Sequence, residues 1–218
     1  MVYKRIIATL LIALSLFSLF SCERDREYDE EQVLSATREL IDKSYKLNEL
    51  LWGKGLSFSD EGIGIYKLAT EESLSEYGIS TLEDIKNMAR EVFSTMYSGI
   101  VFNSDVFTSV KIDDVIKSYA RYYQKYDEND EPAGIMVRSD YEYELKGSYE
   151  YADALSVIDV EGEIIVVRAL ATATSENDKT KTFEVDLRLI EEEGGWRLIS
   201  PTYVVYNEYS DIYEDLKK

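Results

Sequence analysis

Between residues 33 and 51, hydrophobic residues recur every three or four positions, or at twice that spacing, with polar residues between them. This period matches the turn of an α-helix and predicts one long amphipathic helix. Gly53 and Gly55 follow the last apolar position, and glycine is common just past a helix end. We therefore expect the helix to stop there. The apolar stripe consists of Val33, Ala36, Leu40, Leu47 and Leu51.

A second amphipathic helix is predicted to begin near residue 81. Ser80 with Glu83, or Thr81 with Asp84, has the spacing of a capping box, in which two residues three positions apart satisfy each other's backbone N–H groups. The apolar positions that follow recur at helical spacing and define the buried face. They are Leu82, Ile85, Ala89, Val92 and Met96.

Three regions carry weaker patterns. We expect residues 56–78 to form a loop with short elements near 65–68 and 72–77. Residues 111–118 place three apolar residues on one side of a short helix. Residues 119–126 fit two structures, because their tyrosines can form a helical stripe or a strand that precedes the turn-forming sequence DENDEPAG. We favour a β-hairpin, with residues 134–138 as its returning strand.

From residue 141 onwards the period changes to two. Hydrophobic residues alternate with charged ones, which predicts antiparallel strands that bury one face and expose the other. Glu161-Gly162 and Glu193-Gly194-Gly195 mark turns between strands. The predicted strands cover residues 141–145, 154–160, 164–174, 183–189 and 196–199, and Pro201 separates the last of them from an apolar stretch at 203–206.

Helices followed by a run of antiparallel strands define an α+β fold, with N-terminal helices packed on a curved antiparallel sheet. We expect one domain over residues 30–206, since a chain of this length suits a single domain. Residues 207–218 are polar and are predicted to be a tail or a frayed helix.

The N-terminal leader is the most informative segment of the chain. Lys4 and Arg5 precede an apolar run that ends in small Ser21, directly before Cys22, the only cysteine. This order is typical of a secretory signal. With LFSC at its end, the leader resembles the lipobox of bacterial lipoproteins, although Phe20 is bulkier than the residue usual at that position.

The resemblance implies removal of residues 1–21, a diacylglyceryl group on the Cys22 thiol and a short polar tether over residues 22–29. Diacylglycerol supplies the two chains that stable anchoring needs. The implied location is the extracytoplasmic face of a bacterial cell membrane. The alternatives are an ordinary signal peptide and a signal anchor, but the apolar run is short for a spanning helix, which needs about 20 residues.

The chain lacks histidine and has a single cysteine, which excludes several classes of catalytic site, metal site and cross-link. Without a second cysteine, no disulfide can form within the chain. Without histidine, Ser-His-Asp and Cys-His catalytic sites and histidine-bearing zinc sites are excluded. We find no phosphate-binding loop, dinucleotide fingerprint or basic patch, and expect a non-catalytic protein without a cofactor or metal. Paired carboxylates could still catalyse glycoside hydrolysis, but the 43 acidic residues do not single out a pair.

The chain is strongly acidic. The leader carries two basic and no acidic residues, so the rest has 22 basic and 43 acidic residues and a formal charge of −21. Such a field disfavours nucleic acid and favours basic partners, although acidic faces also simply keep an exported domain soluble. The acidic run at 127–131 could suggest calcium, but Pro132 occupies the position where a calcium loop needs glycine, so a solvated turn is preferred.

Tyrosines cluster conspicuously between residues 119 and 151. Aromatic side chains can anchor a protein interface or stack on sugars, and they also pack well in sheets with a wet hydroxyl. Sheet packing is the simpler interpretation. The candidate binding surface consists of Tyr122, Tyr126, Tyr141, Tyr143 and Trp196.

The region after the tether resembles two groups of proteins. The helices followed by a sheet closing on GGWRLISP (194–201) look like the cystatin-like cone of nuclear-transport-factor-like domains, which often hold a pocket. The sequence LLWGKG (50–55), with the same tryptophan strand, also looks like secreted inhibitors of DL-endopeptidase cell-wall hydrolases. The first resemblance implies a domain that binds a small ligand, and the second implies a non-catalytic protein that acts by contact with an envelope enzyme. Together with the acidic charge, the second favours a protein that binds or inhibits a basic envelope protein such as a cell-wall hydrolase.

Overall fold

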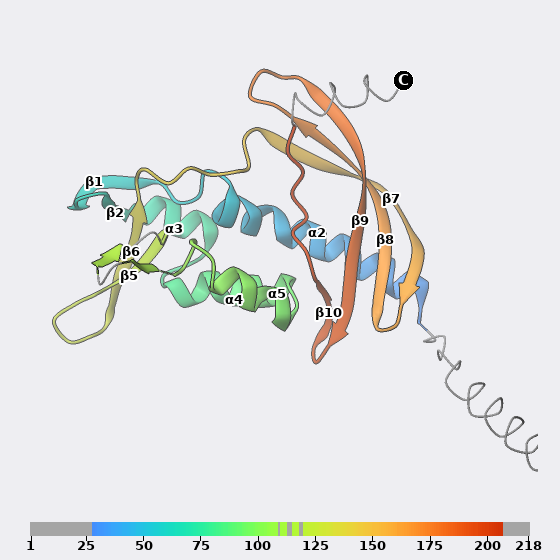
Figure 1. Cartoon of the computed structure of the whole chain (residues 1–218), viewed down its shortest axis with the longest axis horizontal. Helices are drawn as coiled ribbons and strands as arrows, with labels where there is room; N and C mark the ends of the chain where they lie inside the picture. The colour runs from blue at the N-terminus through green and yellow to red at the C-terminus, as the bar shows by residue number, and fades with distance from the viewer. Residues whose placement is uncertain (1–27, 109, 113–114, 118–119, 207–218) are drawn as a thin grey trace, which may run out of the picture.

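The structure is a computed structural model that describes residues 28–108, 110–112, 115–117 and 120–206. The leader, Cys22 and the tail at 207–218 lie outside the described residues, so the predictions for them stay predictions. The protein has an α+β fold, as the sequence predicts, with helices and antiparallel strands around a shared core. Figure 1 shows an elongated molecule with a small sheet at one end and a larger, curved sheet at the other.

Helix α2 (Glu30–Trp52) is the predicted long helix and extends from the N-terminal end of the described chain towards the small sheet (Figure 1). The Asp29 carboxylate caps its first turn by accepting a hydrogen bond from the Gln32 N–H. The helix stops at Gly53, whose N–H donates to the carbonyl oxygens of Asn48 and Glu49. The predicted end is confirmed.

Three shorter helices follow: α3 (Glu71–Tyr77), α4 (Leu82–Val92) and α5 (Thr95–Phe102). Thr81 and Asp84 form the predicted capping box at the start of α4. The prediction that this helix buries Met96 is wrong. The chain is extended at Phe93, and the Ser94 side chain accepts a hydrogen bond from the Tyr97 N–H to start α5, which leaves Met96 66% exposed.

The small sheet has the strand order β1-β2-β6-β5, with every pair antiparallel. The hairpin β5–β6 confirms the strand alternative for residues 119–126, of which Tyr119 itself lies outside the described residues. The short elements expected near 65–68 and 72–77 are β2 and α3. The strands are β1 (Phe58–Ile63), β2 (Tyr66–Ala69), β5 (Tyr122–Tyr126) and β6 (Pro132–Arg138).

Two further predictions of local structure are wrong. The helix expected at 111–118 is an antiparallel pair of strands, β3 (Val110–Ile112) and β4 (Val115–Lys117), as suits a segment rich in β-branched residues. The strand expected at 141–145 is irregular chain. There the N–H of buried Leu145 bonds to the carbonyl oxygen of Trp52 at 2.7 Å, so the segment pairs with the end of α2 and not with a sheet.

The large sheet has the order β10-β9-β8-β7 and the predicted wet and buried faces. Ile165, Val167 and Leu187 are fully buried on one face, where α2 packs, while Arg168 and Asp186 form a 2.8 Å ion pair on the other. Residues 164–174 form a strand with the predicted bounds. The strands are β7 (Ser148–Glu161), β8 (Ile164–Thr174), β9 (Thr180–Glu192) and β10 (Gly195–Leu198).

One hydrophobic core joins the two sheets. Leu50 and Leu51, in the last turn of α2, belong to the same buried cluster as Ile135 of the small sheet and Leu189 of the large one. Because α2 lies against the buried face of the large sheet, its apolar side chains pack on the face that would line the ligand cavity of a cone-shaped domain. Neither four-stranded sheet closes on itself.

Candidate binding groove

Exposed hydrophobic side chains are concentrated on the small sheet. Nine large hydrophobic residues among the described ones are exposed, and five of them belong to the β1–β2 hairpin and β5. Isolated exposed hydrophobics are normal, whereas a concentration of them marks an interaction surface. The five residues are Phe58, Ile63, Ile65, Tyr123 and Tyr126.

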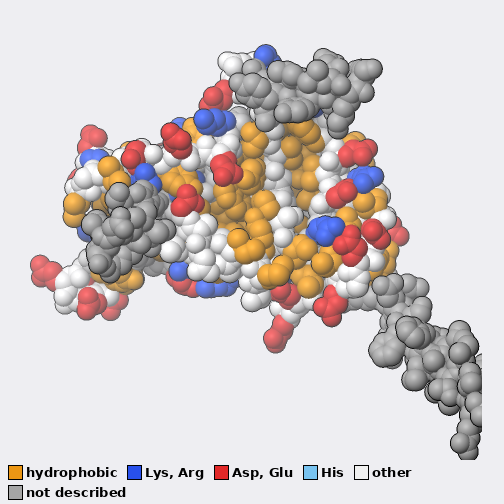
Figure 2. Space-filling view, in the orientation of Figure 1, with side chains coloured by type: hydrophobic (Ala, Val, Ile, Leu, Met, Phe, Trp, Pro, Cys, Tyr) orange, Lys and Arg blue, Asp and Glu red, His pale blue; other side chains and the backbone are white. Residues whose placement is uncertain are grey.

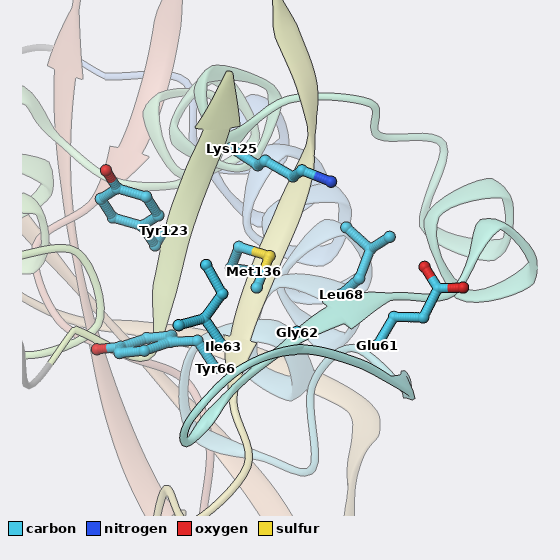
Figure 3. A pocket seen from close by; sticks show the side chains of 8 residues that line it. All are labelled: Glu61, Gly62, Ile63, Tyr66, Leu68, Tyr123, Lys125 and Met136. Atoms are coloured by element: carbon cyan, nitrogen blue, oxygen red, sulfur yellow. The ribbon is translucent and has the colours of Figure 1, made fainter. Parts of the chain in front are cut away.

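A groove crosses the face of the small sheet that points away from the core. We call it the small-sheet groove. It has a volume of about 460 Å³, which lies within the range typical of ligand sites. Figure 3 shows that all four strands contribute to it. Its lining residues are Glu61, Gly62, Ile63, Tyr66, Leu68, Tyr123, Lys125 and Met136.

The register of the strands builds the floor of the groove. Met136 of β6 pairs with Leu68 of β2 on one side and with Tyr123 of β5 on the other, so the three side chains lie in one row across the sheet. Because side chains alternate along a strand, their neighbours Ile135 and Tyr122 point into the core instead. The same strands therefore build an apolar core face and an apolar outer face.

The β1–β2 hairpin forms one wall. Its register breaks between Phe58 and Gly62, and a Cβ atom at position 62 would collide with the carbonyl oxygen of Tyr66. Glycine at this position therefore lets the two strands approach closely. Next to it, Ile63 is 84% exposed, the largest exposed fraction among the described large hydrophobics.

Two tyrosines form another part of the wall. The rings of Tyr66 and Tyr123 lie 6.5 Å apart, centroid to centroid. The Tyr66 hydroxyl donates a 2.9 Å hydrogen bond to the carbonyl oxygen of Ala120, which fixes this ring, while Tyr123 stays 55% exposed. The wall thus combines an anchored ring with one that a partner can cover.

Charged groups lie only at the edges of the groove. Figure 3 shows Glu61 and Lys125 at its rim, away from the apolar floor. Just beyond Lys125, the β5–β6 turn carries four carboxylates within residues 127–131. The Asp127 carboxylate accepts hydrogen bonds from the N–H groups of Glu131 and Asn129, and these bonds hold the pKa of Asp127 below its usual value. Asp127, the first residue of the turn, therefore holds the turn in one conformation.

The structure does not gather the five predicted residues into one exposed surface, although Tyr122 and Tyr141 both lie against the Arg121 guanidinium. Tyr122 is buried, and Trp196 packs in the core shared by α2 and the large sheet. Tyr126 is 56% exposed at the end of β5. Tyr141 is half-buried with its ring 4.7 Å from the Arg121 guanidinium, and Tyr143 is half-buried on the neighbouring irregular segment.

Sequence reasoning missed most of the groove. Tyr123 belongs to the tyrosine cluster between residues 119 and 151. No sequence pattern indicates that Ile63, Leu68 and Met136 lie together at a site. The available signal was the sequence GIGI at 62–65, where isoleucines flanked by glycines indicate a tight hairpin with apolar side chains at its tip.

A larger hollow of about 620 Å³ lies between the start of α2 and the β9–β10 turn. It is lined mainly by charged and polar groups, among them Glu31, Glu39 and Lys43, the last two paired at 2.7 Å. Water satisfies such groups well, whereas covering an apolar surface gains free energy from every buried apolar atom. We therefore take the smaller, apolar groove as the candidate site.

Comparison of the sequence with protein-family models and with curated proteins found no match. Within residues 28–206, outside the short gaps named above, no cluster of three or more Cys, Asp or Glu side chains is arranged to hold a metal ion. Over the same residues, no helix is long and apolar enough to cross a membrane.

Proposed function

We propose that the protein is an extracytoplasmic bacterial lipoprotein, anchored through Cys22, whose domain binds another envelope protein and does not catalyse a reaction. The partner docks on the small-sheet groove. A cell-wall hydrolase held or inhibited in this way fits the proposal. The observation that carries it is the concentration of exposed apolar side chains on one end of an otherwise acidic molecule.

The position of the groove supports this proposal. Helix α2 starts directly after the tether at 22–29 and has 23 residues, which at 1.5 Å per residue gives a length of about 35 Å. The groove lies near its far end (Figure 1). A lipid at Cys22 would hold the near end at the membrane, so the groove would face components beyond the bilayer surface.

The shape of the groove favours a macromolecule. Sites for small molecules usually bury most of the ligand, whereas this groove crosses an open sheet face with Ile63 and Tyr123 projecting from it. A protein surface can cover both Ile63 and Tyr123, whereas a small molecule in the groove would leave much of these side chains exposed. The alternative is a small apolar ligand in the same groove, which its volume of about 460 Å³ would accommodate.

Acidic charge would assist the encounter with a basic partner. Figure 2 shows acidic side chains around the edge of the visible face, several of them at the end of the molecule that carries the β5–β6 turn. Charge of this kind attracts a basic protein from a distance, and the apolar groove then supplies the specific contact.

Site-specific photo-crosslinking tests the proposal. A photoreactive phenylalanine analogue replaces Tyr123 in the full-length protein, and the same analogue replaces Leu170, an exposed residue of the large sheet, as the control. In intact cells, position 123 should give an adduct with one envelope protein that position 170 does not give. The purified partner should then bind wild type but not a variant with Ile63→Ser and Tyr123→Ser. Identical adducts from both positions, or none from position 123, would contradict groove binding.

A further inference from the structure

We infer that the small-sheet groove selects a basic segment of its protein partner, with apolar side chains on the groove floor and Lys or Arg side chains at the β5–β6 turn. This inference rests on the proposed function and adds the chemistry of the docking segment. It follows from the juxtaposition of an apolar floor with a row of carboxylates.

The acidic turn is a direct continuation of the groove. Lys125 lines the groove, and the turn begins two residues later at Asp127, a separation of about 7 Å at the rise of a strand. A segment that covers Tyr123 therefore brings its neighbouring side chains within reach of the turn. Glu61 adds a carboxylate at the rim formed by β1.

The turn is built so that most of its carboxylates face solvent. Asp127 is engaged by the backbone N–H groups of Asn129 and Glu131. Glu128, Asp130 and Glu131 are exposed, and within the described part of the chain their carboxylates accept no hydrogen bond. Three charges are thus held on an ordered turn, and no cation among the described residues pairs with them.

Lys125 is the exception to the acidic rim, and it offers a further test. Within the described residues its ammonium group forms no ion pair. The Lys125 charge repels a basic ligand at short range, whereas the carboxylates of the turn attract it. Lys125→Gln should therefore strengthen binding of a basic segment, whereas it would weaken binding of an acidic one.

The test uses a nine-residue peptide of alternating leucine and lysine as the probe. The full-length protein is placed in nanodiscs of neutral phosphatidylcholine, so that the lipid does not bind the peptide by charge. Two comparison peptides replace leucine by serine or lysine by glutamate. Calorimetry measures affinity at low and at moderate salt.

The variant Glu128→Gln/Asp130→Asn/Glu131→Gln removes the free charges of the turn and keeps Asp127. Its matched control, Glu163→Gln/Glu176→Gln/Glu193→Gln, removes the same number of exposed carboxylates from turns of the large sheet. The turn variant should bind the Leu/Lys peptide about fivefold more weakly at low salt, because three exposed charge pairs are lost. The control should bind it within about twofold of wild type, and the difference should shrink as salt rises.

Three results would overturn the inference. The two triple variants could bind the Leu/Lys peptide with equal affinity, the Ser/Lys peptide could bind as tightly as the Leu/Lys peptide, or the Leu/Lys peptide could fail to bind. The variant Ile63→Ser/Tyr123→Ser separates this failure from that of the proposed function. If Ile63→Ser/Tyr123→Ser abolishes peptide binding while the turn variant leaves the affinity unchanged, the groove binds protein segments without charge selection. If neither variant weakens binding, the groove is not the binding site, and both proposals fail.

Discussion

The Tyr122 hydroxyl donates a 2.8 Å hydrogen bond to the carbonyl oxygen of Leu50 in the last turn of α2. The same hydroxyl accepts a 3.3 Å bond from the Leu56 N–H. This contact ties the end of the long helix to strand β5, and the next residue on that strand, Tyr123, points to the opposite side and lines the groove. The groove is therefore positioned by the core directly beneath it.

Replacing Tyr122 by phenylalanine should destabilise the protein by about 1–3 kcal/mol, because two buried backbone groups lose their partner. Tyr123→Phe is the matched control, since this side chain is exposed, and it should change the free energy of unfolding by less than about 0.5 kcal/mol. Urea unfolding monitored by circular dichroism measures both. Equal stabilities of the two variants would show that the Tyr122 hydrogen bonds do not hold β5 on α2.

Elements with strong local signals could be predicted from the sequence. Helix α2 has a sustained apolar stripe and a terminal glycine, and α4 has the Thr81–Asp84 capping box. The bounds of strand β8 could be predicted because the strand is rich in β-branched residues and lies between two turn-forming sequences. In each case local propensity and the final packing agree.

Other features depend on contacts between distant residues. Residues 111–118 have apolar spacing that fits a helix as well as a strand pair, and only pairing decides between them. The groove floor exists because Met136 is in register with both Leu68 and Tyr123, which are more than fifty residues apart in sequence. Nothing in the local sequence specifies that register, so the sequence could indicate the GIGI hairpin that forms one wall but could not locate the groove floor.

The capping box of α4 should make stability depend on pH in the acidic range. Hydrogen bonds from the Ser80 and Thr81 N–H groups hold the pKa of Asp84 below its usual value of about 3.9. Because the folded-state pKa is depressed, this contribution is present above the unfolded-state pKa and is lost as pH falls through the folded-state value.

Asp84→Asn should therefore be less stable than wild type at pH 7, by roughly 0.5 kcal/mol for this partly buried group in the first turn of α4. The gap should close as pH falls below about 3.9. Thermal unfolding at several pH values measures the gap. A difference between the two proteins that stays constant from pH 7 to pH 2 would show that the Asp84 charge does not stabilise α4.

The lipid anchor makes a separate prediction. Metabolic labelling with a radioactive fatty acid should label the wild-type protein and leave Cys22→Ser unlabelled. Ser21→Ala keeps a small residue before the cleavage site and should be labelled normally. Mass spectrometry of the mature N-terminal peptide should find Cys22 at its start with a diacylglyceryl group attached. A free thiol at Cys22 would exclude lipid anchoring.

The accessibility of the groove in living cells tests the central claim most directly. Cys22 is the only cysteine in the chain, so Lys125→Cys at the groove and Leu170→Cys on the large sheet each add one reactive thiol to a lipidated protein. A small charged maleimide, which reaches the extracytoplasmic space but does not cross the cytoplasmic membrane, is applied to intact cells and to the purified proteins. We predict that Leu170→Cys reacts at similar rates in both, while Lys125→Cys reacts about tenfold more slowly in cells, because a partner covers the groove most of the time. Equal reaction of Lys125→Cys in cells and in purified form, or no reaction of Leu170→Cys in intact cells, would contradict an extracytoplasmic protein that works through this groove.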